Sequence, residues 1–141
     1  MQLERVPSWL RWVLVLPASV AAAVVSYIAV QFGYKILTVI WGTGNSGVPA
    51  RFQTDPDDPF NYIVYQGLAG AAMSLAFVYC GNIIAPKAKH SVSAVLAVLI
   101  SLFFGAELFF ALPDIVIAHI AYACGGIAGG VIAWRTTSQD A

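Results

Sequence analysis

Residues 91–134 read SVSAVLAVLISLFFGAELFFALPDIVIAHIAYACGGIAGGVIAW, and this stretch decides the fold. Pro113 divides it into two apolar runs, each about as long as the 20 residues that a helix needs to cross a hydrocarbon core of about 30 Å. Strand-like alternation is absent, and a helix satisfies every backbone N–H and C=O within its own segment. We therefore predict two transmembrane helices, 91–112 capped by Ser91 and 113–134, joined as a tight antiparallel hairpin.

Two further apolar runs precede this hairpin, at residues 12–41 and 59–85. The second has a clear beginning, because Asp58 can cap a helix and Pro59 suits its first position. Both runs are long enough to span the membrane as helices. The polar segment 42–58 between them, rich in Gly, Pro, Asn and Asp, is expected to form an outer loop.

The composition also indicates a membrane protein. Of the 141 residues, 60% are hydrophobic and 10% are charged, whereas a soluble domain carries about 25% charged residues. Such a chain cannot cover its surface with polar groups, so we expect the lipid bilayer as its solvent. The predicted fold is all-α and polytopic, one four-helix transmembrane domain over residues 1–141. The net charge of zero gives no reason to expect nucleic acid as a partner.

Basic residues predict how the chain is oriented, since they concentrate in cytoplasmic segments. The side that holds both chain ends carries more of them than the opposite side. The first side has Arg5, Arg11, Lys87, Lys89 and Arg135, and the second has Lys35 and Arg51. We therefore expect both termini in the cytoplasm, with the protein in a bacterial cytoplasmic (inner) membrane.

Glu107 is an acid inside an apolar run, where a charge is costly and marks a functional candidate. It lies six residues before Pro113, about 9 Å below the turn at 1.5 Å per residue. His119 lies six residues after Pro113, so the hairpin brings both side chains to the same depth. Two interpretations stay open: a structural pair that locks the bundle, or a proton-sensitive pair with coupled titration.

Polar side chains also recur along one face of the predicted helix 12–41, at helical spacing. They are Ser19, Tyr27, Gln31, Lys35 and Thr38. This stripe either lines a water-filled vestibule, or serves packing. In the second case Lys35 extends to the outer headgroups and Gln31 bonds a neighbouring helix.

Small residues predict where helices pack closely. Such stripes let two backbones approach each other in lipid. In the last two predicted helices they are Ser101, Gly105, Gly125, Gly126, Gly129 and Gly130. Because the glycines of the last helix occupy two adjacent faces, we expect one face to contact another copy of the chain.

Motifs for catalysis or metal binding are missing from the sequence. Cys80 and Cys124 lack metal-ligand spacing, and the acids of 55–58 lack the spacing of a calcium loop. There is no phosphate-binding glycine loop, nucleophile elbow or HExxH. We expect no enzyme, no metal and no cofactor.

In length and helix count the chain resembles two classes of small four-helix membrane protein, the small multidrug transporters and the dimeric fluoride channels. The transporters rely on a glutamate in their first helix, and the run 12–41 holds no acid. The asparagines at 61 and 82 lie near the ends of the second helix and do not form the polar motifs of the channels. The residues therefore assign no family.

Three functions remain after these exclusions. The first is a homo-oligomeric ion channel or pore-type effector, in which several copies enclose a path. The second is a non-catalytic accessory or assembly subunit of a larger membrane complex, which would use only the packing faces. The third is a small proton-coupled carrier that uses Glu107 and His119.

Overall fold

The computed structural model describes residues 7–42, 59–110 and 117–139, which form four helices. The helices are α1 (Ser8–Gly42), α2 (Pro59–Ile84), α3 (Lys89–Phe110) and α4 (Ile117–Gln139). Each contains a run that is long and apolar enough to cross a membrane. The predicted all-α fold with four helices able to span a membrane is thus confirmed.

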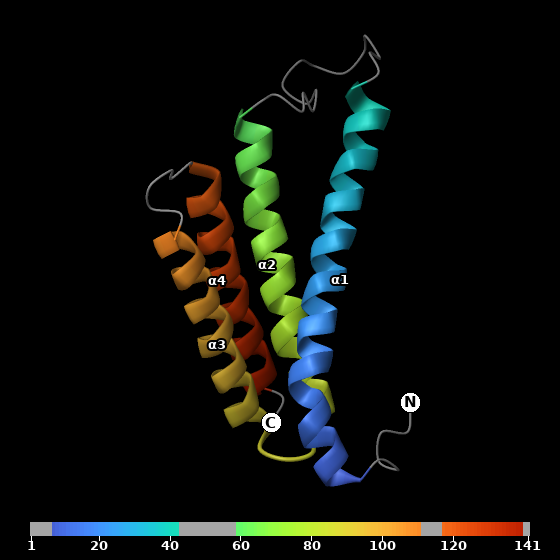
Figure 1. Cartoon of the computed structure of the whole chain (residues 1–141), viewed down its shortest axis with the longest axis vertical. Helices are drawn as coiled ribbons and strands as arrows, with labels where there is room; N and C mark the ends of the chain where they lie inside the picture. The colour runs from blue at the N-terminus through green and yellow to red at the C-terminus, as the bar shows by residue number, and fades with distance from the viewer. Residues whose placement is uncertain (1–6, 43–58, 111–116, 140–141) are drawn as a thin grey trace.

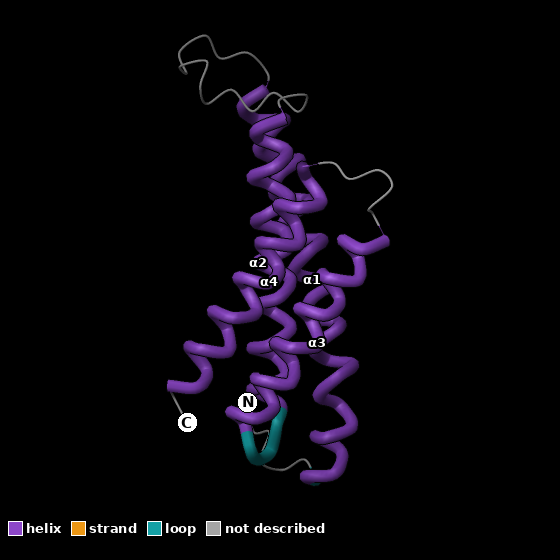
Figure 2. The backbone as a smooth tube through the Cα atoms, turned by 90° about the vertical axis from the view of Figure 1, so that its left-hand side faces the viewer, coloured by secondary structure: helices purple, strands orange, loops and turns teal. Residues whose placement is uncertain are grey.

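Helix α2 lies at the centre of the described bundle. It packs against α1, α3 and α4, and α3 packs in turn against α4. Successive helices run in opposite directions, so the start of α1, the connection from α2 to α3 and the end of α4 lie at one end of the bundle (Figures 1 and 2). We call this the terminal end, and the opposite end the outer end.

The connection between α2 and α3 differs from the prediction. Helix α3 begins at Lys89, so Ser91 lies inside the helix and does not cap it. Ala88, directly before the helix, has a φ of 53°, and this left-handed residue turns the chain into α3. Helix α3 therefore starts directly after the turn at Ala88. The prediction from the capping serine, Ser91, placed this start two residues too late.

The predicted bounds of the last helix also need correction. Helix α4 extends past Trp134 to Gln139, because the polar residues after Trp134 continue the helix beyond the apolar run. Its predicted start at Pro113 and the tight turn before it lie outside the described residues, as does most of the predicted outer loop 42–58.

Arg11 fastens α1 to α2 at the terminal end. Its Nε donates a hydrogen bond to the carbonyl of Ile84 at 3.0 Å, and its Nη2 donates to that of Ala85 at 3.3 Å. The last carbonyls of a helix have no partner within the helix. A guanidinium from the first helix therefore caps the second, in addition to counting as a basic residue for orientation.

Candidate functional site

One tyrosine joins all four helices in the middle of the bundle. Tyr122 on α4 packs edge-on against the fully buried ring of Phe104 on α3, with centroids 5.0 Å apart. Its hydroxyl donates to Sδ of Met73 on α2 at 3.3 Å. Its ring also meets that of Tyr27 on α1 at 6.4 Å, again edge-on. The helices therefore converge on a polar ring inside an apolar core.

Glu107 lies one helical turn from Phe104, on the outer side of this junction. Its side chain is partly buried, and its Oε2 atom has no hydrogen-bond partner among the described residues. A buried carboxylate without a partner is costly, and more so at membrane depth. Among the buried side-chain atoms without a hydrogen-bond partner in the described part of the chain, Oε2 of Glu107 is the carboxylate oxygen.

His119 and Tyr122 are the polar neighbours of Glu107. Both lie within electrostatic range of its carboxylate. They are separated by three positions on α4, so they share one face of that helix. His119 is exposed. The cluster thus combines a half-buried acid, an imidazole at the surface and a phenol at the junction.

The polar stripe of α1 splits into two parts. Towards the terminal end Ser19 is fully buried, and its Oγ donates to the carbonyl of Val15 at 2.7 Å. Tyr27 and Gln31 are half-buried, and Lys35 is exposed. The part near Ser19 therefore packs against protein and lines no vestibule. The side chain of Thr38 lies outside the described ones.

A second aromatic pair continues the cluster towards the outer end. Tyr34 on α1 stacks on Tyr65 of α2, with centroids 4.1 Å apart and an interplanar angle of 21°. Tyr34 lies seven positions after Tyr27, so the two share one face of α1. We define the polar cluster as Tyr27, Tyr34, Tyr65, Glu107, His119 and Tyr122.

The tyrosines of this cluster were not predicted as a group. Tyr27 was named because it lies on the polar stripe of α1. Tyr122 was missed, although its spacing from His119 puts both on one face. Tyr65 and Met73 left no such signal, because only the packing of α2 against its neighbours brings them to the junction.

The glycines of α4 pack within the protomer on both of their faces. A Cβ added to Gly125 or Gly129 would meet the backbone of Gly67 or Ala71 on α2. One added to Gly126 would meet the ring of Phe104 on α3. One added to Gly130 would lie 3.1 Å from Cγ2 of Ile100, also on α3. Both faces are therefore occupied by α2 and α3, and they leave no glycine face for another copy.

The small residues of α3 behave differently. Gly105 is exposed, and a Cβ added there would meet no atom within 4 Å. Gly105 therefore serves no contact with another helix in the described part of the chain. Ser101 is half-buried, and its Oγ donates to the carbonyl of Ala97 at 2.8 Å. Ser101 also lines a groove of about 390 Å³ on the outside of the α3–α4 pair.

Among the described residues, no three side chains of His, Cys, Asp or Glu gather as a metal site. Cys80 donates from its thiol to the carbonyl of Ala18 at 3.5 Å, and Cys124 is a free, exposed thiol. The acids of 55–58 lie outside the described part of the chain.

No family model, curated protein or solved structure matches this chain.

Proposed function

We propose that this protein is a small ion-conducting membrane protein, built from several copies, in which Glu107 binds the proton or small cation that crosses. The observation that carries the proposal is the buried Oε2 of Glu107, which has no hydrogen-bond partner among the described residues. A purely structural carboxylate at membrane depth is expected to be paired. An exchangeable one needs an unfilled position for its ion.

The neighbours of Glu107 suit this role. His119 is exposed and lies within electrostatic range of the carboxylate. An imidazole there is able to pass a proton between the carboxylate and its surroundings. Tyr122 lies on the terminal side of Glu107, with its ring against that of Phe104. The proposed path therefore enters at the outer end, through His119, and reaches Glu107.

Several copies are proposed because the grooves described on one protomer are apolar. The groove beside Ser101 lies between α3 and α4 and opens outwards. Gly105 follows on the same helix, exposed and without a neighbour to its side. A small-residue face of this kind permits close helix contact in lipid. We propose that α3 meets another copy on this face, which lies on the other side of α3 from Glu107, in place of the α4 contact expected from the sequence.

The proposed orientation follows the basic residues. The terminal end, which carries Arg11, Lys87 and Lys89, is proposed to face the cytoplasm. The outer end, towards which the cluster continues, then faces away from the cytoplasm. The proposed location is the cytoplasmic (inner) membrane of a bacterium.

Reconstitution tests this function. Purified protein is placed in lipid vesicles with an imposed pH gradient, and valinomycin with potassium holds the membrane potential constant. The wild-type protein should collapse the gradient faster than empty vesicles do. Sodium and potassium gradients, measured in the same preparation, identify the ion if it is not the proton.

Gly105→Ala tests the proposed contact between copies. A Cβ at that position meets no described atom within 4 Å in the protomer, so the substitution leaves the protomer's own packing unchanged. The Gly105→Ala protein should keep the helical content of the wild type. Its ion flux then shows whether the proposed α3 contact between copies is needed. Wild-type vesicles that match empty ones for every ion would contradict the proposal. In that case co-purification of a different membrane protein would favour the accessory-subunit interpretation.

A further inference from the structure

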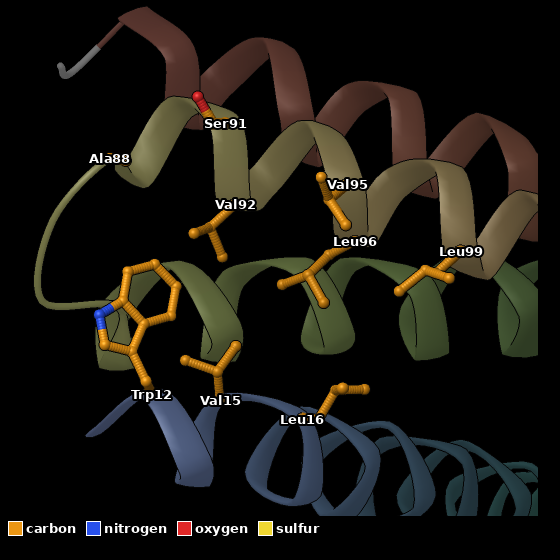
Figure 3. A pocket seen from close by; sticks show the side chains of 9 residues that line it. All are labelled: Trp12, Val15, Leu16, Ala88, Ser91, Val92, Val95, Leu96 and Leu99. Atoms are coloured by element: carbon orange, nitrogen blue, oxygen red, sulfur yellow. The ribbon is translucent and has the colours of Figure 1, made fainter. Parts of the chain in front are cut away.

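A continuous apolar groove runs along the terminal half of the bundle, between α1 and α3. It consists of two cavities of about 370 and 290 Å³. Leu16 on α1 and Leu99 on α3 line both cavities, so the two join end to end. Figure 3 shows the cavity at the terminal end, where side chains of α1 and α3 point towards each other across a gap backed by α2.

The length of the groove along the helix axes is close to the thickness of the hydrocarbon region of one leaflet. On α3 its lining extends from Ser91 to Phe103, a rise of about 18 Å at 1.5 Å per residue. Half of a hydrocarbon core measures about 15 Å. The groove is also open to its surroundings, since Leu16 is 53% exposed and Val95 58%. These dimensions fit one acyl chain of a single leaflet.

Two lysines flank a residue that lines the mouth of the groove. Ala88 and Ser91 line it, and the flanking Lys87 and Lys89 are exposed. The first turn of α3 adds the positive end of a helix dipole. Trp12 stands on the opposite wall at the same level (Figure 3), as expected of a tryptophan at the membrane interface. A phosphate at this position therefore meets positive charge directly above the apolar groove.

We propose that this groove binds one anionic phospholipid of the leaflet at the terminal end. One acyl chain lies between α1 and α3, and the headgroup phosphate lies between Lys87 and Lys89. A helix of another copy fits less well, because a helix is about 10 Å wide and continues through both leaflets. The groove ends at Phe103, one helical turn before Glu107, and its headgroup end at Lys87 and Lys89 lies at the opposite end of the bundle from Glu107. The lipid site therefore does not rest on the proposed function.

Fluorescence quenching by brominated lipids tests the site. Trp9, Trp41 and Trp134 are replaced by Phe, which leaves Trp12 in the groove as the reporter. Vesicles then contain brominated phosphatidylglycerol or brominated phosphatidylcholine, mixed with the unbrominated lipids. Phosphatidylglycerol should associate at Trp12 at least about fivefold more tightly, since one lysine near the surface contributes about that factor for an anionic lipid.

Two variants and one matched reporter complete the design. Lys87→Gln with Lys89→Gln should bring the preference close to one, and Val95→Phe should reduce it by filling the groove. Trp9 lies on the same turn of the same helix end but does not line the groove, so a chain that keeps only Trp9 should show little preference. Circular dichroism of each variant verifies that it is folded.

Several results would overturn the proposal. Equal quenching of Trp12 by both lipids would do so, as would a preference that survives both the lysine replacements and Val95→Phe. Weaker quenching at Trp12 than at Trp9 by both lipids would mean that protein covers the groove. Native mass spectrometry of the wild-type chain gives a second reading, in which the folded protein should retain phosphatidylglycerol and lose it when both lysines are replaced.

Discussion

At the scale of single residues, close contact between backbones positions the polar cluster. Gly125 faces the backbone of Gly67, and Gly70 faces the backbone of Tyr122. These contacts bring α4 so close to α2 that the Tyr122 hydroxyl reaches Met73. Side chains at those positions would separate the helices and move the junction beside Glu107. The glycines therefore contribute to the site without carrying any of its chemistry.

A pair of Gly→Ala substitutions tests this contact. Gly125→Ala places a Cβ on the backbone of Gly67, which cannot rotate away as a side chain would. We expect it to lower the free energy of unfolding by about 1–3 kcal/mol. Gly105→Ala should instead stabilise the protomer by about 0.5–1 kcal/mol, since the added Cβ meets open space and alanine favours the helix.

Thermal unfolding in a mild detergent measures both variants. The two substitutions add the same methyl group to a helical glycine, so their difference isolates the packing. Equal effects of the two on the unfolding midpoint would contradict the contact between α2 and α4.

At the scale of elements, the side chain of Arg11 links the start of α1 to the end of α2. Arg11 donates to two carbonyls at the end of α2. Further along α1, the fully buried Ser19 lies against Gly81 of α2. A Cβ added to Gly81 would lie 2.6 Å from Oγ of Ser19. These contacts of Arg11 and Ser19, which we call the Arg11 clamp, therefore set the position of α1, the helix on which Tyr27 reaches the junction at Tyr122.

Arg11→Met should lower the free energy of unfolding by about 2 kcal/mol, because it removes hydrogen bonds from a charged donor and leaves two carbonyls without it. Arg11→Lys should recover part of this loss, since an ammonium is able to serve one carbonyl. The exposed Lys89→Met, compared in detergent without added phospholipid so that its proposed lipid is absent, is the control with the same loss of charge. Chemical unfolding in detergent compares the three, and an equal effect of Arg11→Met and Lys89→Met would speak against the clamp.

The helices themselves could be predicted from the sequence, but not the faces by which they meet. Length and apolarity are local properties, so the spans around Leu96 and Ala71 were found correctly. Each helix carries apolar residues on all of its faces, so the sequence pattern does not show which face packs against a neighbouring helix. Both glycine faces of α4 were recognised, but one was assigned to another copy because sequence cannot show that α2 and α3 occupy both.

Of the candidate site, the sequence predicted Glu107, His119 and Tyr27, the last because it lies on the polar stripe of α1. Glu107 was found because a carboxylate in an apolar run is costly wherever it faces. His119 was found because it lies as far after Pro113 as Glu107 lies before it. Tyr65 and Met73 were not found, because a tyrosine or methionine costs little in such a helix. Their roles depend on tertiary contacts with Tyr34 and Tyr122.

At the scale of the whole molecule, the two ends of the bundle have different chemistry. The outer half holds the polar cluster, in which Oε2 of Glu107 has no hydrogen-bond partner among the described residues. The terminal half holds the Arg11 clamp and an apolar groove below Lys87 and Lys89. The polar cluster and the apolar groove are therefore arranged one after the other along the length of the bundle.

The central claim is that Glu107 binds an ion that exchanges, and does not lock the bundle. The measurement that tests it most directly is proton flux and thermal midpoint of Glu107→Gln, taken on the same reconstituted sample, with Glu107→Leu beside it. The amide keeps the size and hydrogen-bonding capacity of the side chain but cannot exchange a proton. We expect Glu107→Gln to keep the wild-type midpoint and to reduce the flux to that of empty vesicles. Wild-type flux in Glu107→Gln, or a flux loss no larger than its loss of folded protein, would contradict the account.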